Sequence, residues 1–545
     1  MAVDQLDFEL KAGESLGIVG ESGSGKTLSA LSIMQLLPNK AQSTGEIWWK
    51  GSTRLDELSG SALNKIRGKQ IGMIFQEPLS SLNPVMTCGE QIAEVLRAHL
   101  SLDRKSVRQR VLDWLTKVEL GEPERIYRAY PHELSGGQRQ RVMIAMALSA
   151  EPELLIADEP TTALDVTVQR AVLHLIKSLQ AELGIAILFI SHDLGVIREV
   201  ADRVMVMQDG NKVEEGSVNA IFSSPQHPYT EGLLNCRAST HQQLRRLPTV
   251  QDFLAKEKED ISRFMEGLKL SSQELSDRQE YLQSQSTILR VNDLQVWYAA
   301  KKNWLGQTTE QVKAVEKVSF ALRAGECLGI VGESGSGKTT LGKSILRLIP
   351  IRGGEIWFGD HLLTSLSESE LRPLRPDLQM VFQDPFSSLN PKFTIHQLLR
   401  EPLLIHHREQ SAEEHDARIV EVLHQVGLDE SVLLRYPKDF SGGQRQRIGL
   451  ARALLLRPKV LVCDESVSAL DVSVQAQVLN LIKTLQETYE FSLLFISHDL
   501  AVVRFIADRV LVMQQGEMVE LAPTDELFNA PKEAYTRQLL NAVLD

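Results

Sequence analysis

Two copies of a glycine-rich pattern carry the clearest chemistry in this sequence. The stretch GESGSGKT occupies residues 20–27 and again residues 332–339. Each copy follows a short apolar run and precedes a predicted helix, the context in which G-x-x-x-x-G-K-[ST] forms a phosphate-binding loop (P-loop). Backbone N–H groups and the helix N-terminus then face phosphate oxygens. The predicted nucleotide-binding residues of the two loops are Gly20, Glu21, Ser22, Gly23, Ser24, Gly25, Lys26, Thr27, Gly332, Glu333, Ser334, Gly335, Ser336, Gly337, Lys338 and Thr339.

A P-loop works with a divalent cation, which needs a carboxylate ligand in addition to the threonine hydroxyl of the loop. We expect Lys26 and Lys338 to reach the β- and γ-phosphates of ATP. LLIADE (154–159) and VLVCDE (460–465) each place an aspartate at the end of a buried strand, where a carboxylate is costly unless it faces a cation. The predicted Mg²⁺ ligands are Thr27, Gln76, Asp158, Thr339, Gln383 and Asp464.

Hydrolysis also needs a group that accepts a proton from the attacking water. A glutamate follows each of these aspartates and is placed to do so, although it could instead cap the next segment. The carboxamides at 76 and 383 can reach both metal and water, and the histidine of each FISHD stretch could contact the γ-phosphate or be structural. The predicted catalytic residues are Glu159, His192, Gln76, Glu465, His498 and Gln383.

The chain is an internal duplication. AVDQLDFELKAGESLGIVGESGSGKT at 2–27 matches AVEKVSFALRAGECLGIVGESGSGKT at 314–339. IFQEPLSSLNP at 74–84 likewise matches VFQDPFSSLNP at 381–391. Because this similarity extends over most of the sequence, we predict a first domain at 1–235, a linker at 236–287 and a second domain at 288–545.

Each half is predicted to have an α/β fold. Short apolar runs such as SLGIVG, LLIAD and AILFIS, with CLGIVG, VLVCD and SLLFIS in the second half, alternate with helical patterns. This alternation favours a largely parallel sheet core with an additional antiparallel part. Residues 85–150 and 392–456 have long amphipathic stretches and no clear strand, so we expect a helical subdomain inserted in each half.

The segment between the halves is polar. Within it, Ile261, Phe264, Met265 and Leu268 have helical spacing. The simpler interpretation is a tether with one docked helix, and the alternative is a helix that binds a regulator or partner.

Composition excludes several classes of protein. The 545 residues carry a net charge of −12, which argues against a protein that coats nucleic acid. No run approaches the roughly 18 apolar residues of a membrane span, and the start lacks the pattern of a secretory signal. The four cysteines lie far apart, which excludes a zinc ribbon and a disulfide framework and fits a reducing cytoplasm.

One further repeated stretch carries a family resemblance. LSGGQRQRV begins at residue 134 and FSGGQRQRI begins at residue 440. With the P-loops and the Asp-Glu pairs, they resemble the ATP-binding-cassette (ABC) ATPases over nearly the whole chain except the linker. The resemblance implies two P-loop NTPase domains with RecA-like cores, in which the signature of one cassette closes over the P-loop of the other. The implied nucleotide contacts are Ser135, Gly136, Gly137, Gln138, Ser441, Gly442, Gly443 and Gln444, and at the domain interface Asp165 and Asp471.

Such composite sites combine residues of both halves. The first would join Lys26, Asp158 and Glu159 to Ser441, Gly442 and Gly443, and the second would join Lys338, Asp464 and Glu465 to Ser135, Gly136 and Gly137. Because every catalytic position is filled twice, we predict two competent sites.

The resemblance also implies an aromatic platform for adenine, which fits Tyr298 beside Trp297, unless these are ordinary strand residues. Met1 aligns with residue 313, so the first domain is expected to lack the N-terminal strand and the adenine-stacking loop. Either the start is placed too late, or the first site binds adenine without that platform.

Subgroup features are similar to oligopeptide-type importers. They are SSLNP after each glutamine, and SPQHPYTEGLL (224–234) and APKEAYTRQLL (530–540) near the end of each half. Tandem fusion is similar to ATPases for peptide, microcin C-like or glutathione import. The resemblance implies a motor at the cytoplasmic face of the bacterial inner membrane, with two permease subunits, indirectly a solute-binding protein, and no nucleic acid.

Residues 77–84 and 384–391 are the candidate permease-docking surfaces, or else merely well-formed turns. The alternative function is a soluble tandem ABC ATPase acting on ribosomes or nucleic acid. Residues 236–290 carry nine Lys/Arg against eight Asp/Glu, so they do not form the basic arm that such ribosome factors usually have.

Overall fold

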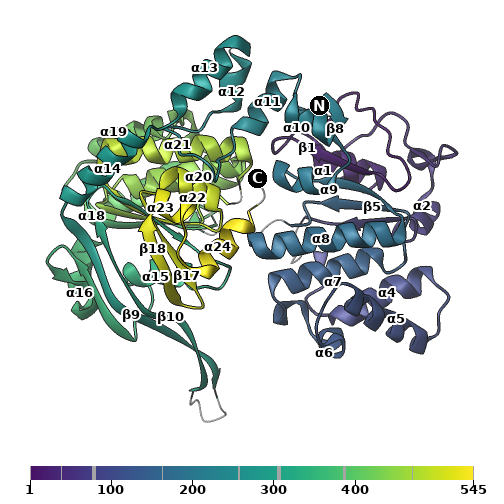
Figure 1. Ribbon diagram of the computed structural model, residues 1–545, viewed down its shortest axis with the longest axis horizontal. Helices are drawn as coiled ribbons and strands as arrows, with labels where there is room; N and C mark the ends of the chain where they lie inside the picture. The colour runs from purple at the N-terminus through teal and green to yellow at the C-terminus, as the bar shows by residue number, and fades with distance from the viewer. Residues whose placement is uncertain are drawn as a thin grey trace. The chain divides into compact units, whose positions relative to one another are not determined.

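The structure is a computed structural model that forms two compact units. It describes residues 2–38, 40–76, 81–161, 164–255, 258–302, 308–384, 388–468 and 470–543. The first unit is Met1–Asn235 with Val250–Ala255, and the second is Cys236–Thr249 with Lys256–Val543. Figure 1 traces both units along the chain.

The first unit is built on a six-stranded sheet of order β4-β5-β6-β1-β7-β8. Neighbouring strands are parallel except β7 and β8. The strands are β1 (Ser15–Val19), β4 (Ile71–Ile74), β5 (Leu154–Asp158), β6 (Ala186–Ile190), β7 (Arg203–Gln208) and β8 (Asn211–Ser217). The first, third and fourth of these are buried along their whole length, which explains their uninterrupted apolar sequences.

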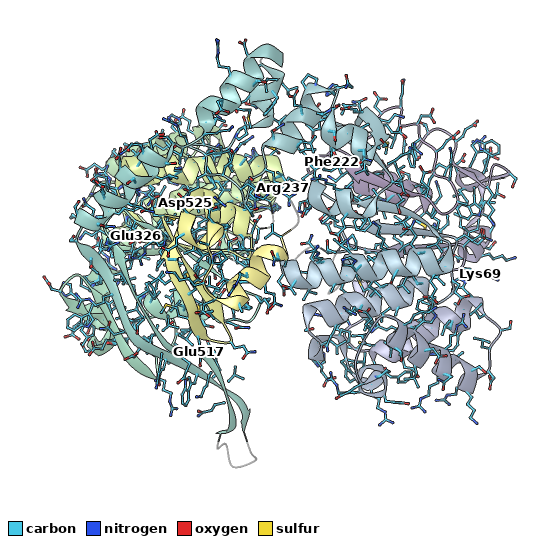
Figure 2. All side chains as sticks on the ribbon, in the orientation of Figure 1. Lys69, Phe222, Arg237, Glu326, Glu517 and Asp525 are labelled. Carbon is cyan, nitrogen blue, oxygen red and sulfur yellow. The ribbon has the colours of Figure 1, made fainter. Side chains whose placement is uncertain are left out.

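The second unit repeats this sheet in the order β14-β15-β16-β11-β17-β18. Its strands are β11 (Cys327–Val331), β14 (Leu378–Val381), β15 (Val460–Asp464), β16 (Ser492–Ile496), β17 (Arg509–Gln514) and β18 (Glu517–Pro523). The residue before β11, Glu326, is fully buried and forms an ion pair with Arg509 at 3.1 Å (Figure 2). The corresponding pair of the first unit is Glu14 with Arg203, at 2.7 Å. The predicted α/β fold, with its largely parallel sheets, is therefore confirmed in both halves.

Helices cover the sheets and form the inserted subdomains (Figure 1). Those of the first unit are α1 (Lys26–Ile33), α2 (Gly60–Ile66), α4 (Cys88–His99), α5 (Arg104–Lys117), α6 (Pro123–Arg128), α7 (Gly136–Leu148), α8 (Val166–Leu183), α9 (Leu194–Val200), α10 (Val218–Ser223) and α11 (Pro228–Asn235). Those of the second are α15 (Lys338–Ile345), α16 (Glu368–Leu371), α18 (Ile395–His406), α19 (Ala412–Gln425), α20 (Gly442–Leu454), α21 (Val472–Tyr489), α22 (Leu500–Ile506), α23 (Thr524–Asn529) and α24 (Ala534–Asn541). Across the described part of the chain, none of these helices combines the length and apolar character needed to cross a bilayer.

The antiparallel sheets are where the two units differ. In the second unit, β9 (Thr287–Lys302) and β10 (Thr308–Arg323) form a long ribbon that pairs onward with β12 (Gly353–Phe358) and β13 (His361–Leu362) (Figure 1). Among the described residues of the first unit, the corresponding sheet contains β2 (Trp48–Trp49) and β3 (Thr53–Arg54). The ribbon adds Leu289, Val291, Leu294 and other apolar residues to the core of the second unit.

The segment between the halves is more structured than a tether with one docked helix. It contains α12 (Val250–Leu254), the expected helix α13 (Lys258–Leu268) and α14 (Ser272–Ser284). In the second unit, Leu247 exchanges two hydrogen bonds with the Asn480 side chain, at 2.7 and 2.8 Å. Arg278 of α14 forms an ion pair with Asp508 at 2.9 Å. Polar contacts of this kind are invisible to hydrophobic periodicity, which explains why only α13 was predicted.

Candidate nucleotide-binding and hydrolysis sites

The two P-loops connect β1 to α1 and β11 to α15, at the carboxyl ends of parallel strands, where α/β sheets bind ligands. The predicted loop residues lie in these two turns, except that Lys26, Thr27, Lys338 and Thr339 begin the helices that follow. A Cβ atom on Gly20 would lie 2.2 Å from the carbonyl oxygen of Met207, and one on Gly332 would lie 2.2 Å from that of Met513. Glycine is required at both positions because no side chain fits against the neighbouring strand.

The P-loop lysines are held by the loops themselves. Lys26 Nζ donates to the carbonyl oxygens of Gly20 and Glu21, each at 2.8 Å. Lys338 does the same with Gly332 and Glu333, again at 2.8 Å. Both lysines are buried, so each loop holds a cation within the turn itself.

The hydroxyl of Ser24 supports a phosphate ligand in the first loop. The residue is only 3% exposed, and among the described residues its Oγ has no hydrogen-bond partner. A buried polar atom without a partner is costly, and a phosphate oxygen would satisfy it.

Asp158 and Asp464 lie at the ends of β5 and β15, beside the P-loop threonines. Thr27 donates its hydroxyl to Asp158 at 3.2 Å, and Thr339 donates to Asp464 at 2.9 Å. Burial raises the pKa of Asp158 to about 6 and also raises the pKa of Asp464, although the threonine contacts act in the opposite direction. Hydroxyl and carboxylate oxygens around a buried negative charge suit a small hard cation such as Mg²⁺.

The structure brings the other predicted catalytic residues together around the two glutamates. Gln76 Nε2 donates to Glu159 at 3.0 Å, and Gln383 Nε2 donates to Glu465 at 2.7 Å. His192 Nδ1 lies 3.0 Å from the Glu159 carboxylate. In the second unit, His498 Nδ1 lies 3.5 Å from the Glu465 carboxylate. Two carboxylates are thus held in place by the same two kinds of side chain.

The backbone at these glutamates is unusual. The φ angle is +48° at Glu159 and +44° at Glu465, in the left-handed region that side chains seldom adopt. Each N–H donates to the end of the neighbouring strand, at Ile190 or Ile496, with a distance of 2.9 Å. Such strain concentrates at functional sites, where the surrounding structure maintains it.

In the second unit, the glutamate and histidine favour each other's charged form. Burial by itself would raise the pKa of Glu465, but the hydrogen bond and charge of His498 outweigh it and lower that pKa. Burial would likewise lower the pKa of His498, but its contact with Glu465 raises it overall. The carboxylate is therefore ionised, as a proton acceptor must be.

Each signature stretch begins a helix, α7 or α20, through a capping box. Ser135 Oγ accepts the N–H of Gln138 at 3.3 Å, and Gln138 Oε1 accepts the N–H of Ser135 at 3.1 Å. Ser441 and Gln444 make the same exchange at 3.4 and 3.1 Å. The serine and glutamine therefore define the helix start, and the binding of an anion by its N–H groups stays a prediction.

The second glycine of each signature allows two helices to approach closely. A Cβ on Gly137 would lie 2.6 Å from Val168 of α8, and one on Gly443 would lie 2.3 Å from Val474 of α21. Asp165 accepts the N–H of Val168 at 2.9 Å and so caps α8, whereas Asp471 precedes α21 without a side-chain cap bond.

Tyr298 lies on β9, opposite Val312 of β10 and 43% exposed. Two residues further along β10, the carbonyl oxygen of Ala314 packs against Gly337 of the P-loop. A Cβ atom on Gly337 would lie only 2.1 Å from that oxygen. The neighbouring Trp297 donates its indole N–H to Glu316 at 2.8 Å. In the first unit, the Ala2 carbonyl takes the place of Ala314, 2.7 Å from a Cβ on Gly25.

Two tyrosines that were not predicted from the sequence contact the P-loops. Tyr229 and Tyr535 accept the N–H groups of Glu21 and Glu333, at 3.2 and 3.3 Å. Both tyrosines occur at matching places in the repeated stretches near the end of each half, and that repetition was the only signal available. Of the proposed docking surfaces, residues 77–80 and 385–387 lie outside the described residues.

Comparison with known families identifies the chain. The family model for the ABC transporter matches residues 3–162 and 315–468. The chain belongs to the ABC transporter family. A second model, for the C-terminal region of oligopeptide/dipeptide transporters, matches residues 213–263 and 519–545 of this ABC transporter. Its first match extends into the segment predicted as a linker.

Relatives are similar to this ABC transporter over its whole length. The peptidoglycan transport ATP-binding protein YejF of Agrobacterium fabrum is 45% identical over 100% of this chain and 93% of its own. The glutathione import ATP-binding protein GsiA of Pectobacterium atrosepticum is 45% identical over 99% of this chain and 86% of its own. A solved dimeric ATP-binding cassette bound to ADP and phosphate is 28% identical, with a TM-score of 0.39, over 43% of this chain and 98% of that one. As a family member, this chain binds and hydrolyses ATP.

Proposed function

We propose that this ABC transporter chain is the ATP-hydrolysing subunit of an importer, and that it energises uptake of peptides or peptide-like solutes. The observation that carries the proposal is its full-length similarity to two ATP-binding proteins, one named for peptidoglycan transport and one for glutathione import. The matches to the oligopeptide/dipeptide C-terminal model in both halves support the same solute class. None of these relatives supports the soluble ribosome- or nucleic-acid-acting alternative.

The mechanism follows from the side chains of each site. Lys26 and Lys338 hold the phosphates, and Glu159 and Glu465 accept the proton of the attacking water. Gln76 and His192, or Gln383 and His498, orient these carboxylates. Thr27 and Asp158, with Thr339 and Asp464 in the second unit, would hold Mg²⁺ together with the glutamine carboxamides. The metal would neutralise phosphate charge.

We further propose that the two cassettes pair head to tail, so that each signature completes the other cassette's site. The capped starts of α7 and α20 support this pairing, because each offers a helix N-terminus but no lysine. Such a surface suits a phosphate that is already bound by the P-loop lysine of the other cassette. Residues 1–235 and 288–545 would be the two ATPase domains, joined through 236–287.

A cross-site substitution tests the pairing. Ser441→Arg should impair nucleotide trapping at the Lys26 site more than at the Lys338 site, because a bulky cation would block the signature. Photo-crosslinking with 8-azido-ATP, followed by mapping of the labelled P-loop, measures each site separately. Equal loss at both sites, or loss confined to the Lys338 site, would contradict the pairing.

The partners would be two integral membrane permeases and, indirectly, a solute-binding protein, with this chain at the cytoplasmic face of the bacterial inner membrane. ATP binding would bring the cassettes together, and the helical subdomains would pass the motion to the permeases.

Reconstitution tests the import function directly. Proteoliposomes containing the chain and its genomic-neighbour permeases should take up a labelled tripeptide or glutathione only with internal MgATP. The Lys26→Ala, Lys338→Ala double variant should lose uptake, whereas Lys69→Ala, at an exposed lysine labelled in Figure 2, should retain it. Co-sedimentation with ribosomes and no uptake would favour the soluble alternative.

A further inference from the structure

The two tyrosines that touch the P-loops are buried in corresponding positions of the two units. Tyr229 is 0% exposed and Tyr535 is 8% exposed. In each case the phenol oxygen accepts a P-loop N–H, from Glu21 at 3.2 Å or from Glu333 at 3.3 Å. A buried tyrosine needs a hydrogen-bond partner for its hydroxyl, and in both units the N–H of the second P-loop residue provides one.

A glutamate, buried in the second unit and partly exposed in the first, anchors the segment that carries each tyrosine. In the second unit, Glu520 of β18 accepts the N–H groups of Lys532 and Glu533, at 3.0 and 3.2 Å, and the hydroxyl of Thr536 at 2.6 Å. In the first unit, Glu214 of β8 accepts the N–H groups of Gln226 and His227, at 2.8 and 3.1 Å. The start of α11 or α24 is thereby attached to the edge of the sheet, and the tyrosine is directed at the P-loop.

The tyrosine and the P-loop lysine hold opposite ends of the same peptide group. The carbonyl of Gly20 accepts from Lys26 Nζ at 2.8 Å, while the N–H of the same peptide, belonging to Glu21, donates to Tyr229. The second unit repeats this arrangement. Hydrogen bonds at the two ends of one amide strengthen each other and fix its plane.

This peptide matters because the lysine must share its charge between the loop and a phosphate. When the lysine also contacts a phosphate, its bond to the carbonyl weakens, and the phenol is the other contact that holds the amide. Without the phenol, the first turn of the P-loop would have to be ordered by the nucleotide itself, which would weaken binding.

We propose that Tyr229 and Tyr535 are positioning residues that set the nucleotide affinity of the P-loop in their own unit. Both belong to the regions matched by the oligopeptide/dipeptide C-terminal model, so this role gives that region a direct connection to the ATP site. The inference rests on ATP binding and not on import.

Equilibrium titration of the full chain with MgADP tests each site in isolation. In a Lys338→Ala background, adding Tyr229→Phe should raise the dissociation constant by roughly two- to tenfold, the effect of losing one hydrogen bond. In a Lys26→Ala background, Tyr535→Phe should do the same. The crossed combinations, with the tyrosine changed in the unit whose lysine is already lost, should leave the remaining affinity unchanged.

Steady-state hydrolysis provides a second readout. The Tyr229→Phe, Tyr535→Phe double variant should raise the KM for ATP by a similar factor and keep kcat within about twofold, since the catalytic glutamates are untouched. General damage to the fold would instead lower kcat.

Matched controls remove a tyrosine hydroxyl elsewhere. Tyr127 donates to Glu90 at 3.2 Å, and Tyr489 donates to Gln425. Their phenylalanine variants should leave the dissociation constant for MgADP and the KM for ATP unchanged. An unaltered dissociation constant in the two test variants, or equal losses in the crossed combinations, would overturn the proposal. If the unchanged chain bound no MgADP, that result would instead contradict the membership of this chain in the ATP-binding family.

Discussion

The two halves make the same contacts around their P-loops but differ in the antiparallel sheet beside them. In both, lysine caps the P-loop carbonyls, threonine contacts the strand-end aspartate, and glutamine and histidine hold the glutamate. The antiparallel sheet contains four strands in the second unit, and β2 and β3 among the described residues of the first. Contacts that recur despite such different surroundings are determined by the repeated motifs and by the strand order that the two sheets share.

Smaller differences follow the same division. Asp165 caps α8 with its side chain, but Asp471 makes no such bond at α21. Lys338 also contacts Ser336 at 3.5 Å, while Ser24 has no partner among the described residues. The hydrogen bonds to the two Asp-Glu pairs recur despite these differences, so we predict two equivalent hydrolysis sites and unequal base-binding sites.

The largest expected effect tests the equivalence of the hydrolysis sites. Glu159→Gln and Glu465→Gln together should lower turnover by at least about 100-fold, because a general base is lost from both sites. The turnover of the two single variants should fall to the same extent. Phosphate release at saturating MgATP measures this, with Glu182→Gln, at an exposed glutamate, as the control. Unequal single variants would show that the matching contacts conceal a functional asymmetry.

The next effect concerns helix packing at the signatures. Gly137→Ala and Gly443→Ala should each lower the free energy of unfolding by about 1–3 kcal/mol, because the added methyl overlaps a valine. The loss should be greater at Gly443, where the overlap is closer. Thermal or urea unfolding measures both.

The neighbouring glycines supply the control for that experiment. A Cβ on Gly136 or Gly442 would lie 3.6 or 3.5 Å from the nearest leucine atom, an ordinary contact, so these alanine variants should unfold normally. Equal losses at all four glycines would mean that helix starts, and not interhelical packing, determine the sensitivity.

A third prediction separates the base-binding sites. Tyr298→Ala should weaken nucleotide binding at the second site by about tenfold, since stacking on an aromatic ring contributes about 1–3 kcal/mol. The Kd measured in a Lys26→Ala background, with Tyr281→Ala as an exposed control, tests it. A normal affinity would identify Tyr298 as an ordinary strand residue and remove the proposed difference between the sites.

The smallest effect is a pH dependence of the C-terminal helix. Burial would raise the pKa of Glu520, but hydrogen bonds from Thr536 and two backbone N–H groups lower it below the ordinary value of 4.5. The stability it contributes is therefore present above that value and is lost as pH falls through the lower folded-state pKa. Glu520→Gln should remove about 1 kcal/mol at neutral pH and less in acid. Unfolding measured between pH 3 and 7 tests this, and a constant difference would contradict it.

Much of the fold could be predicted because local sequence determines it. Runs such as SLGIVG are too apolar and too short to be anything but buried strands, and the glycines of the P-loops accommodate contacts that exclude a side chain. The predicted cluster also came together, because Asp158 ends one parallel strand and Gln76 and His192 follow the strands on either side of it.

What could not be predicted depends on contacts between residues distant in sequence. Tyr229 meets a P-loop that lies 208 residues earlier, and nothing in the local pattern gives that pairing. The bonds of Leu247 to Asn480 likewise join segments 233 residues apart and involve no apolar periodicity. Repetition between the halves was the remaining signal, and it showed that the tyrosine recurs without showing what it touches.

The continuity of the chain through residues 236–287 has a kinetic consequence. Separate cassettes must meet by diffusion, so their pairing depends on concentration. Two cassettes on one chain meet at an effective concentration that the connecting segment fixes. If they pair as proposed, the ATPase activity per molecule should not change on dilution, and the two sites should always be present in a one-to-one ratio.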